Sequence, residues 1–403
     1  MSKIDDMIKK LCPNGVEHKI LGEVCSIGKG VQFNKKDMLD EGSYPVINGG
    51  INPSGYIEQY NETEKTITIS QGGASAGYVN WIETKFWAGA HCYVLKPNES
   101  VVLNRYVYHF VKSKEYKLQE CQYGAGIPAL AKSTINDLLI PVPPLEIQEE
   151  IVRILDNFTE LTAELTAELT ARRKQYEYYR DALLSFGKVS PPLTFGLNNE
   201  EVRWMTLGEI ATVTKLAGFE FTNYVTYSDK GKVIALRGLN VKDGKLVLND
   251  VKYIDGSDFS KLSRSKLCIG DMLFTYVGTV GQVALIDEND KYYLAPNVSM
   301  IRLQSENVLP KFMMYYFRTK SFWNEQISKL LQQSSMQNIP MEKIRKFSLP
   351  IPSLSEQERI VAILDKFDAL VNDLSQGIPA EIEARKKQYE YYRDKLLTFK
   401  KAS

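Results

Sequence analysis

Two stretches decide the architecture of this chain: residues 140–158 read IPVPPLEIQEEIVRILDNF, and residues 349–367 read LPIPSLSEQERIVAILDKF. They match at a constant offset of 209 residues. A second matching pair follows, RKQYEYYRDALLSF at 173–186 and KKQYEYYRDKLLTF at 386–399, at an offset of 213. The chain is therefore an internal duplication, with four extra residues between the blocks of its second copy.

Each Pro-rich stretch leads into a long predicted helix. Proline favours extended geometry, and apolar residues then recur at alternating steps of three and four from Leu145 to Phe186, as in a coiled-coil seam. The same pattern runs from Ile360 to Leu396 in the second copy. There it is interrupted by Gly377-Ile378-Pro379, so we predict a kink or short loop at 377–379.

The first helix contains a perfect tandem tetrapeptide. Its residues are Thr162, Ala163, Glu164 and Leu165, followed directly by Thr166, Ala167, Glu168 and Leu169. Strong helix formers of this kind also serve as ordinary helix filler. An exact repeat is unusual enough that we interpret it as a device that sets the length of the helix.

The segments between the repeated blocks, about 24–135 and 210–344, show little mutual similarity. Strand patterns occur at 66–70 in the first and at 232–237, 272–276 and 283–286 in the second, and glycines punctuate both segments. An amphipathic helix is predicted near the end of each, at 104–118 and 310–331. We expect a twisted, mostly antiparallel sheet with a few helices in each segment, which gives an α+β chain.

Composition excludes several classes of protein. Only three histidines and five dispersed cysteines occur among 403 residues, which argues against a structural zinc site. Neither a phosphate-binding G-x-x-x-x-G-K-[ST] loop nor a G-x-G-x-x-G motif is present, and no Ser/His/Asp set can be built in the second half. The amino-terminal MSKIDDMIKK lacks the apolar core of a signal peptide, and no run of 18 apolar residues exists. We expect a non-catalytic cytoplasmic protein with no membrane partner.

Binding is the remaining chemistry, and charge distinguishes the two segments. Residues 202–350 carry 20 Lys/Arg and 14 Asp/Glu, a net of +6, whereas residues 1–140 carry 15 of each. Asn and Gln can read adenine, Arg can read guanine, and Lys can neutralise phosphates, so polar loop residues are candidate DNA contacts. The candidates are Lys29, Gln32, Asn34, Lys35, Lys36, Asn52, Gln71 and Tyr123 in the first segment, and Asn223, Arg237, Asn240, Tyr276, Gln333, Ser334, Ser335, Gln337 and Asn338 in the second. Each of them also suits an ordinary solvated loop.

Together these features resemble the specificity subunit of type I restriction–modification enzymes over nearly the whole chain. The resemblance rests on the duplicated Pro-x-Pro-(Pro/Ser)-Leu-x-x-Gln-x-x-Ile lead, at 141–151 and 350–360, on the paired long helices, and on the Leu-Gly-Glu that opens each half. The tandem Thr-Ala-Glu-Leu is similar to that of one subfamily.

The resemblance implies two globular mixed α/β target recognition domains, 1–143 and 199–352, each reading one half of a split site in double-stranded DNA. It implies conserved spacer helices at 144–198 and 353–403 that pack antiparallel as a coiled coil with pseudo-two-fold symmetry. Two modification subunits would dock on this frame with S-adenosylmethionine, and restriction (translocase) subunits would bring ATP and Mg. No cofactor or metal is expected on this chain.

Two other classes stay open at this point. A coiled-coil scaffold that binds protein partners would show no sequence-specific DNA binding. A DNA methyltransferase in its own right needs an (Asp/Asn/Ser)-Pro-Pro-aromatic motif, and the nearest string, Ser190-Pro191-Pro192-Leu193, ends in leucine within a linker.

Overall fold

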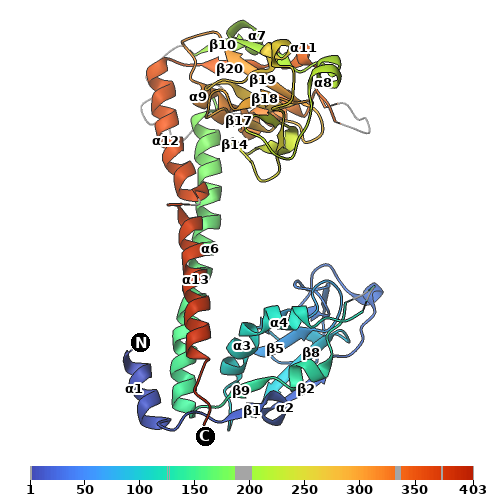
Figure 1. Cartoon of the computed structure of the whole chain (residues 1–403), viewed down its shortest axis with the longest axis vertical. Coiled ribbons are helices and arrows are strands. Elements are labelled where there is room, and N and C mark those ends of the chain that lie inside the picture. The colour runs from blue at the N-terminus through green and yellow to red at the C-terminus, as the bar shows by residue number, and fades with distance from the viewer. Residues whose placement is uncertain are drawn as a thin grey trace. The chain divides into compact units, whose positions relative to one another are not determined.

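The computed structural model describes residues 2–124, 126, 128–186, 202–331, 337–373 and 375–402. The chain divides into two compact units (Figure 1). Unit 1 comprises Met1–Ala167 and Ala380–Ser403, and unit 2 comprises Glu168–Pro379. Each unit thus combines one of the dissimilar segments with helical sequence from both copies of the repeat.

Unit 1 is built from short strands and helices followed by parts of two long helices. Its elements are α1 (Ser2–Leu11), β1 (His18–Ile20), α2 (Leu21–Val24), β2 (Cys25–Lys29), η1 (Lys35–Asp37), β3 (Tyr44–Ile47), β4 (Tyr56–Ile57), β5 (Thr66–Ser70), β6 (Val79–Ile82), β7 (Trp87–Ala88), β8 (Cys92–Pro97), α3 (Asn104–Ser113), α4 (Glu115–Glu120), α5 (Lys132–Asn136), β9 (Leu139–Pro141), the first part of α6 (Leu145–Leu183) and most of α13 (Ile378–Leu396).

Unit 2 contains the rest of α6 and the following elements: β10 (Arg203–Thr206), α7 (Leu207–Ile210), β11 (Ala211–Lys215), α8 (Gly218–Tyr224), β12 (Ile234–Leu236), η2 (Gly238–Asn240), β13 (Val241–Lys242), β14 (Lys245–Leu246), β15 (Lys252–Tyr253), η3 (Phe259–Lys261), η4 (Ser263–Ser265), β16 (Met272–Thr275), β17 (Val283–Leu285), β18 (Tyr292–Leu294), β19 (Val298–Leu303), α9 (Pro310–Phe317), α10 (Lys320–Phe322), η5 (Trp323–Ile327), α11 (Met341–Ile344), β20 (Ser348–Ile351) and α12 (Leu354–Asn372).

The two units share one topology despite their dissimilar sequences. A four-stranded antiparallel sheet runs β2-β8-β5-β6 in unit 1 and β11-β19-β16-β17 in unit 2. A second sheet runs β4-β3-β7 and β15-β12-β18, with one parallel pair in each case. The prediction of mostly antiparallel sheets is confirmed. The β13–β14 hairpin of unit 2 has no matching strand pair among the strands of unit 1.

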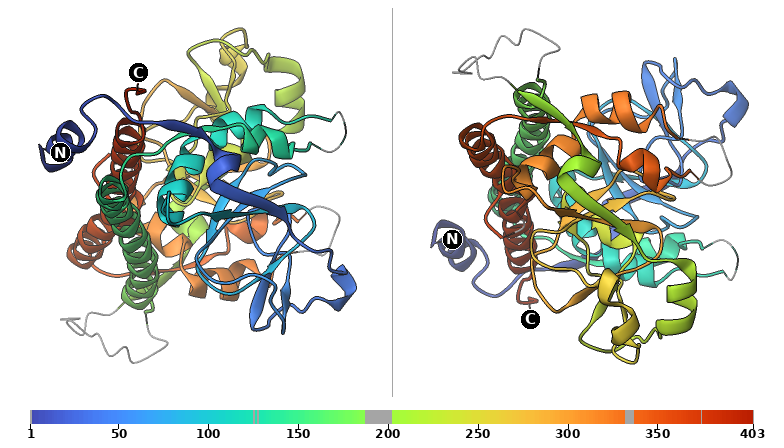
Figure 2. Two further views of the ribbon diagram at one scale, coloured as in Figure 1. Left: turned by 90° about the horizontal axis from the view of Figure 1, so that it is seen from below. Right: turned by 90° about the horizontal axis from the view of Figure 1, so that it is seen from above.

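Each unit packs its sheet against helices, but the predicted single helices are divided. Residues 104–118 form α3 and α4, which turn at Lys114, where ψ is 2°. Residues 310–331 form α9, then α10 and the π-helical turn η5, because Thr319 caps a new helix start by accepting from Phe322 N. Figure 2 shows the same ribbon from below and from above the view of Figure 1.

The repeated blocks are exchanged between the units. In unit 1, α13 lies antiparallel to the first part of α6, with Phe158 stacked on Tyr392 at 5.3 Å between ring centroids (Figure 1). In unit 2, α12 pairs with the second part of α6, and Phe367 stacks on Tyr179 at the same distance. The antiparallel pairing of the repeated helices is therefore confirmed inside each unit.

One glutamine of each Pro-rich lead fixes the helix start to its unit. Gln148 is fully buried, accepts from Leu103 N at 2.8 Å, and donates to the carbonyls of Val101 and Pro143. The buried Gln357 repeats this arrangement, accepting from Leu309 N and donating to the carbonyls of Asn307 and Pro352. This explains why the lead is repeated so closely.

Replacing either glutamine by leucine is expected to lower the free energy of unfolding by about 2–4 kcal/mol. The change leaves one N–H and two carbonyls without this partner, and the carbonyl of Pro143 or Pro352 is buried; an unpaired buried group costs about 1–3 kcal/mol. Denaturant unfolding of Gln148→Leu and Gln357→Leu measures this. The adjacent exposed Glu149→Ala is the control, with a change within about 0.5 kcal/mol. Equal stabilities for all three variants would contradict the assigned role.

A repeated aspartate holds the next helical turn. His109 Nε2 lies 2.8 Å from Asp156 Oδ1, and Arg105 Nε donates to the same oxygen. In unit 2 the matching Asp365 accepts from Lys311 and from the Tyr315 hydroxyl. Burial lowers the pKa of His109, although Asp156 opposes this shift. The imidazole of His109 therefore stays neutral in the folded chain at pH values below the usual histidine pKa.

Stability of unit 1 is expected to fall as the pH drops below about 6.5, the ordinary histidine pKa. The unfolded chain then takes up a proton on His109 that the folded chain does not, so acid favours unfolding. One such proton changes stability by at most about 1.4 kcal/mol per pH unit. Denaturant unfolding at pH 7, 6 and 5 should show a smaller loss for His109→Gln than for the parent chain. His18→Gln, at a less buried histidine, is the control and should follow the parent.

The long helices differ from the predicted seam at two places. Leu161 is 45% exposed, and none of the residues 156–175 of α6 is buried, so the seam is not continuous through the tandem tetrapeptide. The buried positions of α6 lie instead near its two ends, where it enters the cores of the two units. In the second copy, α12 ends at Asn372 and α13 begins at Ile378, so Pro379 lies in the first turn of α13. Among the described helices, none is long and apolar enough to cross a membrane.

Candidate nucleic-acid interface

Three segments of unit 1 meet at one edge of its four-stranded sheet. Gln71, directly after β5, donates its backbone N–H to His91 O at 2.9 Å and accepts from Leu130 N at 2.7 Å. Gly73 donates to Pro128 O, and Tyr123 exchanges two backbone hydrogen bonds with Ala129. The loop that ends at residue 130 is thus tied to the end of β5.

Unit 2 repeats these backbone contacts with other side chains. Tyr276 donates its N–H to Asn297 O at 3.3 Å and accepts from Ile339 N at 2.9 Å. Gly278 donates to Gln337 O, and Val277 forms a bridge with Asn338. Gly73 and Gly278 both adopt left-handed φ angles, +79° and +78°, which side chains rarely tolerate. The same turn therefore presents Gln71 in one unit and Tyr276 in the other.

A lysine is the last residue of the outer strand, β2 or β11, of the four-stranded sheet in each unit. Lys29, the last residue of β2, lies 5.8 Å from the ring centroid of Tyr93. Lys215, the last residue of β11, lies 5.9 Å from that of Tyr276. Both lysines are exposed. Burial raises the pKa of Tyr276, so its hydroxyl stays protonated and able to donate.

These groups define two polar clusters. The first cluster is Lys29, Gln71, His91 and Tyr123; Lys29 joins it through Tyr93, whose hydroxyl donates to Leu130 O. The second cluster is Lys215, Tyr276, Asn297, Gln337 and Asn338. An exposed cation beside amides and phenols at a sheet edge suits binding to a phosphate backbone together with base edges. Nucleic acid is the ligand class that this chemistry fits best.

The other candidates from the sequence fall into three groups. Six of them are exposed on loops, on η1 or on α8, and no contact among the described residues brings them into either cluster. These are Gln32, Asn34, Lys35, Lys36, Asn52 and Asn223. Gln333, Ser334 and Ser335 lie outside the described residues. Arg237 is engaged internally, since it donates to the carboxylate and the carbonyl of Asp250.

Asn240 corrects the sequence interpretation. It is fully buried, donates its amide to the carbonyls of Val247 and Asp250, and accepts from Arg237 N. An amide with all these bonds inside its own unit has no free edge for a base. Asn240 therefore holds η2 together rather than contacting DNA.

Sequence reasoning missed Lys215 and His91. Lys215 was detectable, because the repeat that opens each half places Leu207 opposite Leu21, and counting on from it places Lys215 opposite Lys29. His91 had no such signal, because it reaches the first cluster only through pairing of β8 with β5. Its equivalence to Asn297 is visible only in the backbone contacts.

Comparison with known proteins supplies independent findings. Residues 13–172 and 199–384 match the type I restriction modification DNA specificity domain. A Haemophilus influenzae protein named as a type I restriction enzyme specificity subunit is 30% identical over 396 residues, which cover 95% of this chain and 96% of that protein. The EcoR124I/EcoR124II specificity subunit of Escherichia coli is 30% identical over 431 aligned residues, 100% of this chain and 98% of that one. The solved S subunit of a type I restriction–modification system from M. genitalium aligns with a TM-score of 0.59 at 18% identity, over 94% of this chain and 96% of that chain, and so shares its fold.

Proposed function

This chain belongs to the type I restriction–modification DNA specificity family, and we propose that its two polar clusters each read one half of a bipartite site in double-stranded DNA. The family is the non-catalytic component that gives such systems their DNA sequence specificity. One observation carries the assignment to these clusters. The same backbone frame holds Gln71 and His91 in unit 1 but Tyr276 and Asn297 in unit 2. A constant frame with different polar side chains is what two readers of different half-sequences require.

The same proposal gives the repeated helices a second task, the docking of two modification subunits. Tyr178 is 53% exposed and its repeat Tyr391 is 62% exposed. Lys174, Glu177 and their repeats are exposed as well. Packing inside the chain does not require identical side chains at exposed positions. Two copies of one partner, each contacting one copy of the block, would require identical exposed side chains. The pseudo-two-fold arrangement of the helical frame is part of this proposal.

Catalytic cofactors are placed on the partners under this proposal. S-adenosylmethionine would come with the modification subunits, and ATP with Mg would come with the restriction subunits. Among the described residues, no group of three or more His, Cys, Asp or Glu side chains gathers in a way that could hold a metal. A pure protein scaffold is not favoured, because family membership carries DNA specificity with it. We place the chain in the cytoplasm, together with the DNA that it reads.

Substitution of one cluster is expected to relax only one half of the recognised sequence. Gln71→Ala should lower discrimination at one base pair of one half-site by about 1–3 kcal/mol, and Gln337→Ala should do so in the other half. Lys29→Ala and Lys215→Ala should instead weaken binding to every sequence and reduce the salt slope by about one. Mapping methylated sites after co-expression with the modification subunit, with binding measured at several salt concentrations, tests this. Unchanged half-sequences in both glutamine variants would contradict the assignment to the clusters, while leaving family membership intact.

A further inference from the structure

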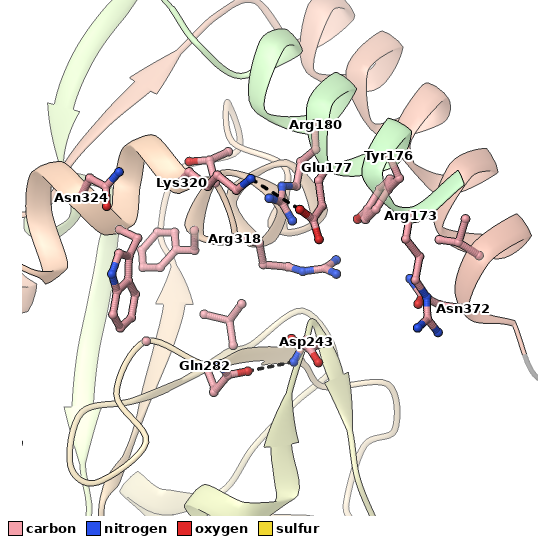
Figure 3. A pocket seen from close by; sticks show the side chains of 16 residues that line it. Arg173, Tyr176, Glu177, Arg180, Asp243, Gln282, Arg318, Lys320, Asn324 and Asn372 are labelled. Carbon is pink, nitrogen blue, oxygen red and sulfur yellow. Dashed lines mark hydrogen bonds and ion pairs between the residues drawn. The ribbon is translucent and has the colours of Figure 1, made fainter. Parts of the chain in front are cut away.

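Unit 2 contains a pocket that the reading of DNA does not use. Figure 3 shows it between the end of α6, the turn after α9, the β13–β14 turn and the end of α12. Its volume is about 510 Å³, within the range of small-ligand sites. Four cations line it, Arg173, Arg180, Arg318 and Lys320, against two carboxylates, Glu177 and Asp243.

A buried hydroxyl in this pocket has no hydrogen-bond partner. Tyr176 is only 4% exposed, and its hydroxyl bonds to no described residue. The carboxylate of Asp368 lies near it, but outside hydrogen-bonding geometry, and is engaged with Lys245 and the Asn372 amide. In unit 1 the matching hydroxyl of Tyr389 lies 3.1 Å from His109 Nδ1. The tyrosine hydroxyl therefore has a partner inside unit 1 but none among the described residues of unit 2.

The cation beside this hydroxyl, Arg318, has only a long ion-pair contact among the described residues of unit 2. The side chain of Arg318 is 12% exposed, its guanidinium lies 5.8 Å from the Tyr176 ring centroid, and its nearest ion-pair contact is 3.6 Å to Asp368. The matching Lys112 of unit 1 donates to the Glu115 carboxylate and to Val79 O.

The position of Glu115 is occupied by Ser321 in unit 2, whose hydroxyl bonds to Glu325, so the close carboxylate contact of unit 1 is replaced by the longer contact to Asp368. Of the other cations in the pocket, Arg180 pairs with Asp181, and Lys320 pairs with Glu177, the ion pair that Figure 3 draws. Arg173, at the exposed rim, has no ion pair or hydrogen bond within the part of the chain that the structure describes.

We propose that this pocket binds a small oxyanion, a phosphate or carboxylate group, between Tyr176, Arg318 and Arg173. The hydroxyl donates one hydrogen bond, and the guanidinium groups supply charge-assisted bonds, the stronger kind in proteins. The anion is placed between α6, which carries Tyr176 and Arg173, and the turn after α9, which carries Arg318. The bound anion thereby joins α6 to the turn after α9, so that the stability of this contact inside unit 2 depends on a ligand.

The test uses the full chain and inorganic phosphate as the probe. Thermal unfolding and calorimetric titration compare sodium phosphate with sodium chloride at equal ionic strength, with acetate as a separate carboxylate arm. Saturable stabilisation by phosphate or by acetate is expected, and the arm that responds identifies the source of the anion. No saturable effect in either arm overturns the proposal.

Three variants separate binding from folding. Tyr176→Phe should weaken anion binding about tenfold without lowering stability in chloride, because the hydroxyl has no partner to lose. Arg173→Ala should weaken anion binding without lowering stability in chloride, because it removes an exposed pocket guanidinium that has no partner among the described residues. Tyr389→Phe is the matched control in unit 1, where stability should fall while anion affinity stays unchanged. Wild-type affinity in both Tyr176→Phe and Arg173→Ala would overturn the proposal.

Discussion

Deletion of Thr166–Leu169 is expected to redirect methylation to sites with unchanged half-sequences and a gap shorter by one or two base pairs. Four helical residues span about 6 Å and rotate the helix by about 400°, close to one full turn, so the packing face is nearly kept. One base pair of B-DNA spans about 3.4 Å. None of the eight repeat residues is buried, and Leu169, which packs partly buried against the core of unit 2, is replaced by Leu165 after the deletion. The boundary between the units also falls inside the repeat, after Ala167.

The second copy can follow such a change because it is not one continuous helix. Between α12 and α13 the chain leaves helical geometry after Asn372 and resumes it at Ile378. Loop residues adjust their end-to-end distance at little cost, whereas helical residues do not. The extra residues of the second copy therefore lie where an adjustment of length is least costly.

A two-residue deletion is the matched control. Removing Glu164 and Leu165 shortens the helix by about 3 Å but rotates it by about 200°, which turns the following apolar positions away from their partners. Methylation should then be lost rather than redirected. Duplicating Thr166–Leu169 should lengthen the gap by the same step. An unchanged gap in an active four-residue deletion would mean that the repeat is filler, and altered half-sequences would argue against reading by the two clusters.

The sequence was sufficient for the helices because their signal is local. The Pro-rich leads, the three-and-four spacing and the break near Gly377 each act within a few residues. In the structure α6 and α12 begin just after the leads, and α12 ends at Asn372 before α13 begins at Ile378. No such local signal predicts that residues 386–399 pack in unit 1 and residues 173–186 in unit 2. Tyr392 and Phe158 are far apart in sequence, and each block also suits pairing within its own copy.

The clusters were only partly predictable, because amides and guanidinium groups serve structure and recognition equally well. Gln71 and Asn240 look alike in the sequence, yet one ends a strand at the open sheet edge and the other is buried beneath η2. Only the long-range pairing of strands separates the two roles. The common topology of the units was also hidden, because strand order depends on alternating burial and turn geometry, which dissimilar residues can share.

A fragment of residues 1–198 is expected to form a homodimer that directs methylation to an inverted repeat. In the full chain, Phe158 stacks on Tyr392 in unit 1 and Phe367 stacks on Tyr179 in unit 2. These are one contact made twice, since Tyr179 and Tyr392 are repeats of each other. In the fragment, Tyr179 of a second copy can take the place of Tyr392, and Tyr176 can take the place of Tyr389 beside His109. Two identical units related by a true two-fold axis must read two identical half-sequences in opposite orientation.

The contrast between fragment and full chain makes this prediction sharp. Phe158→Ala removes one stack from the full chain but both stacks from the dimer, and each aromatic pair contributes about 0.5–1.5 kcal/mol beyond its buried area. The substitution should therefore weaken fragment dimerisation by about tenfold or more, measured by light scattering across a concentration series, while the full chain stays folded and active. The exposed Glu160→Ala serves as the control and should leave dimerisation unchanged. A fragment that stays monomeric with the modification subunit present, or that directs methylation to a site without inverted symmetry, would contradict the exchange of equivalent helices on which the frame rests.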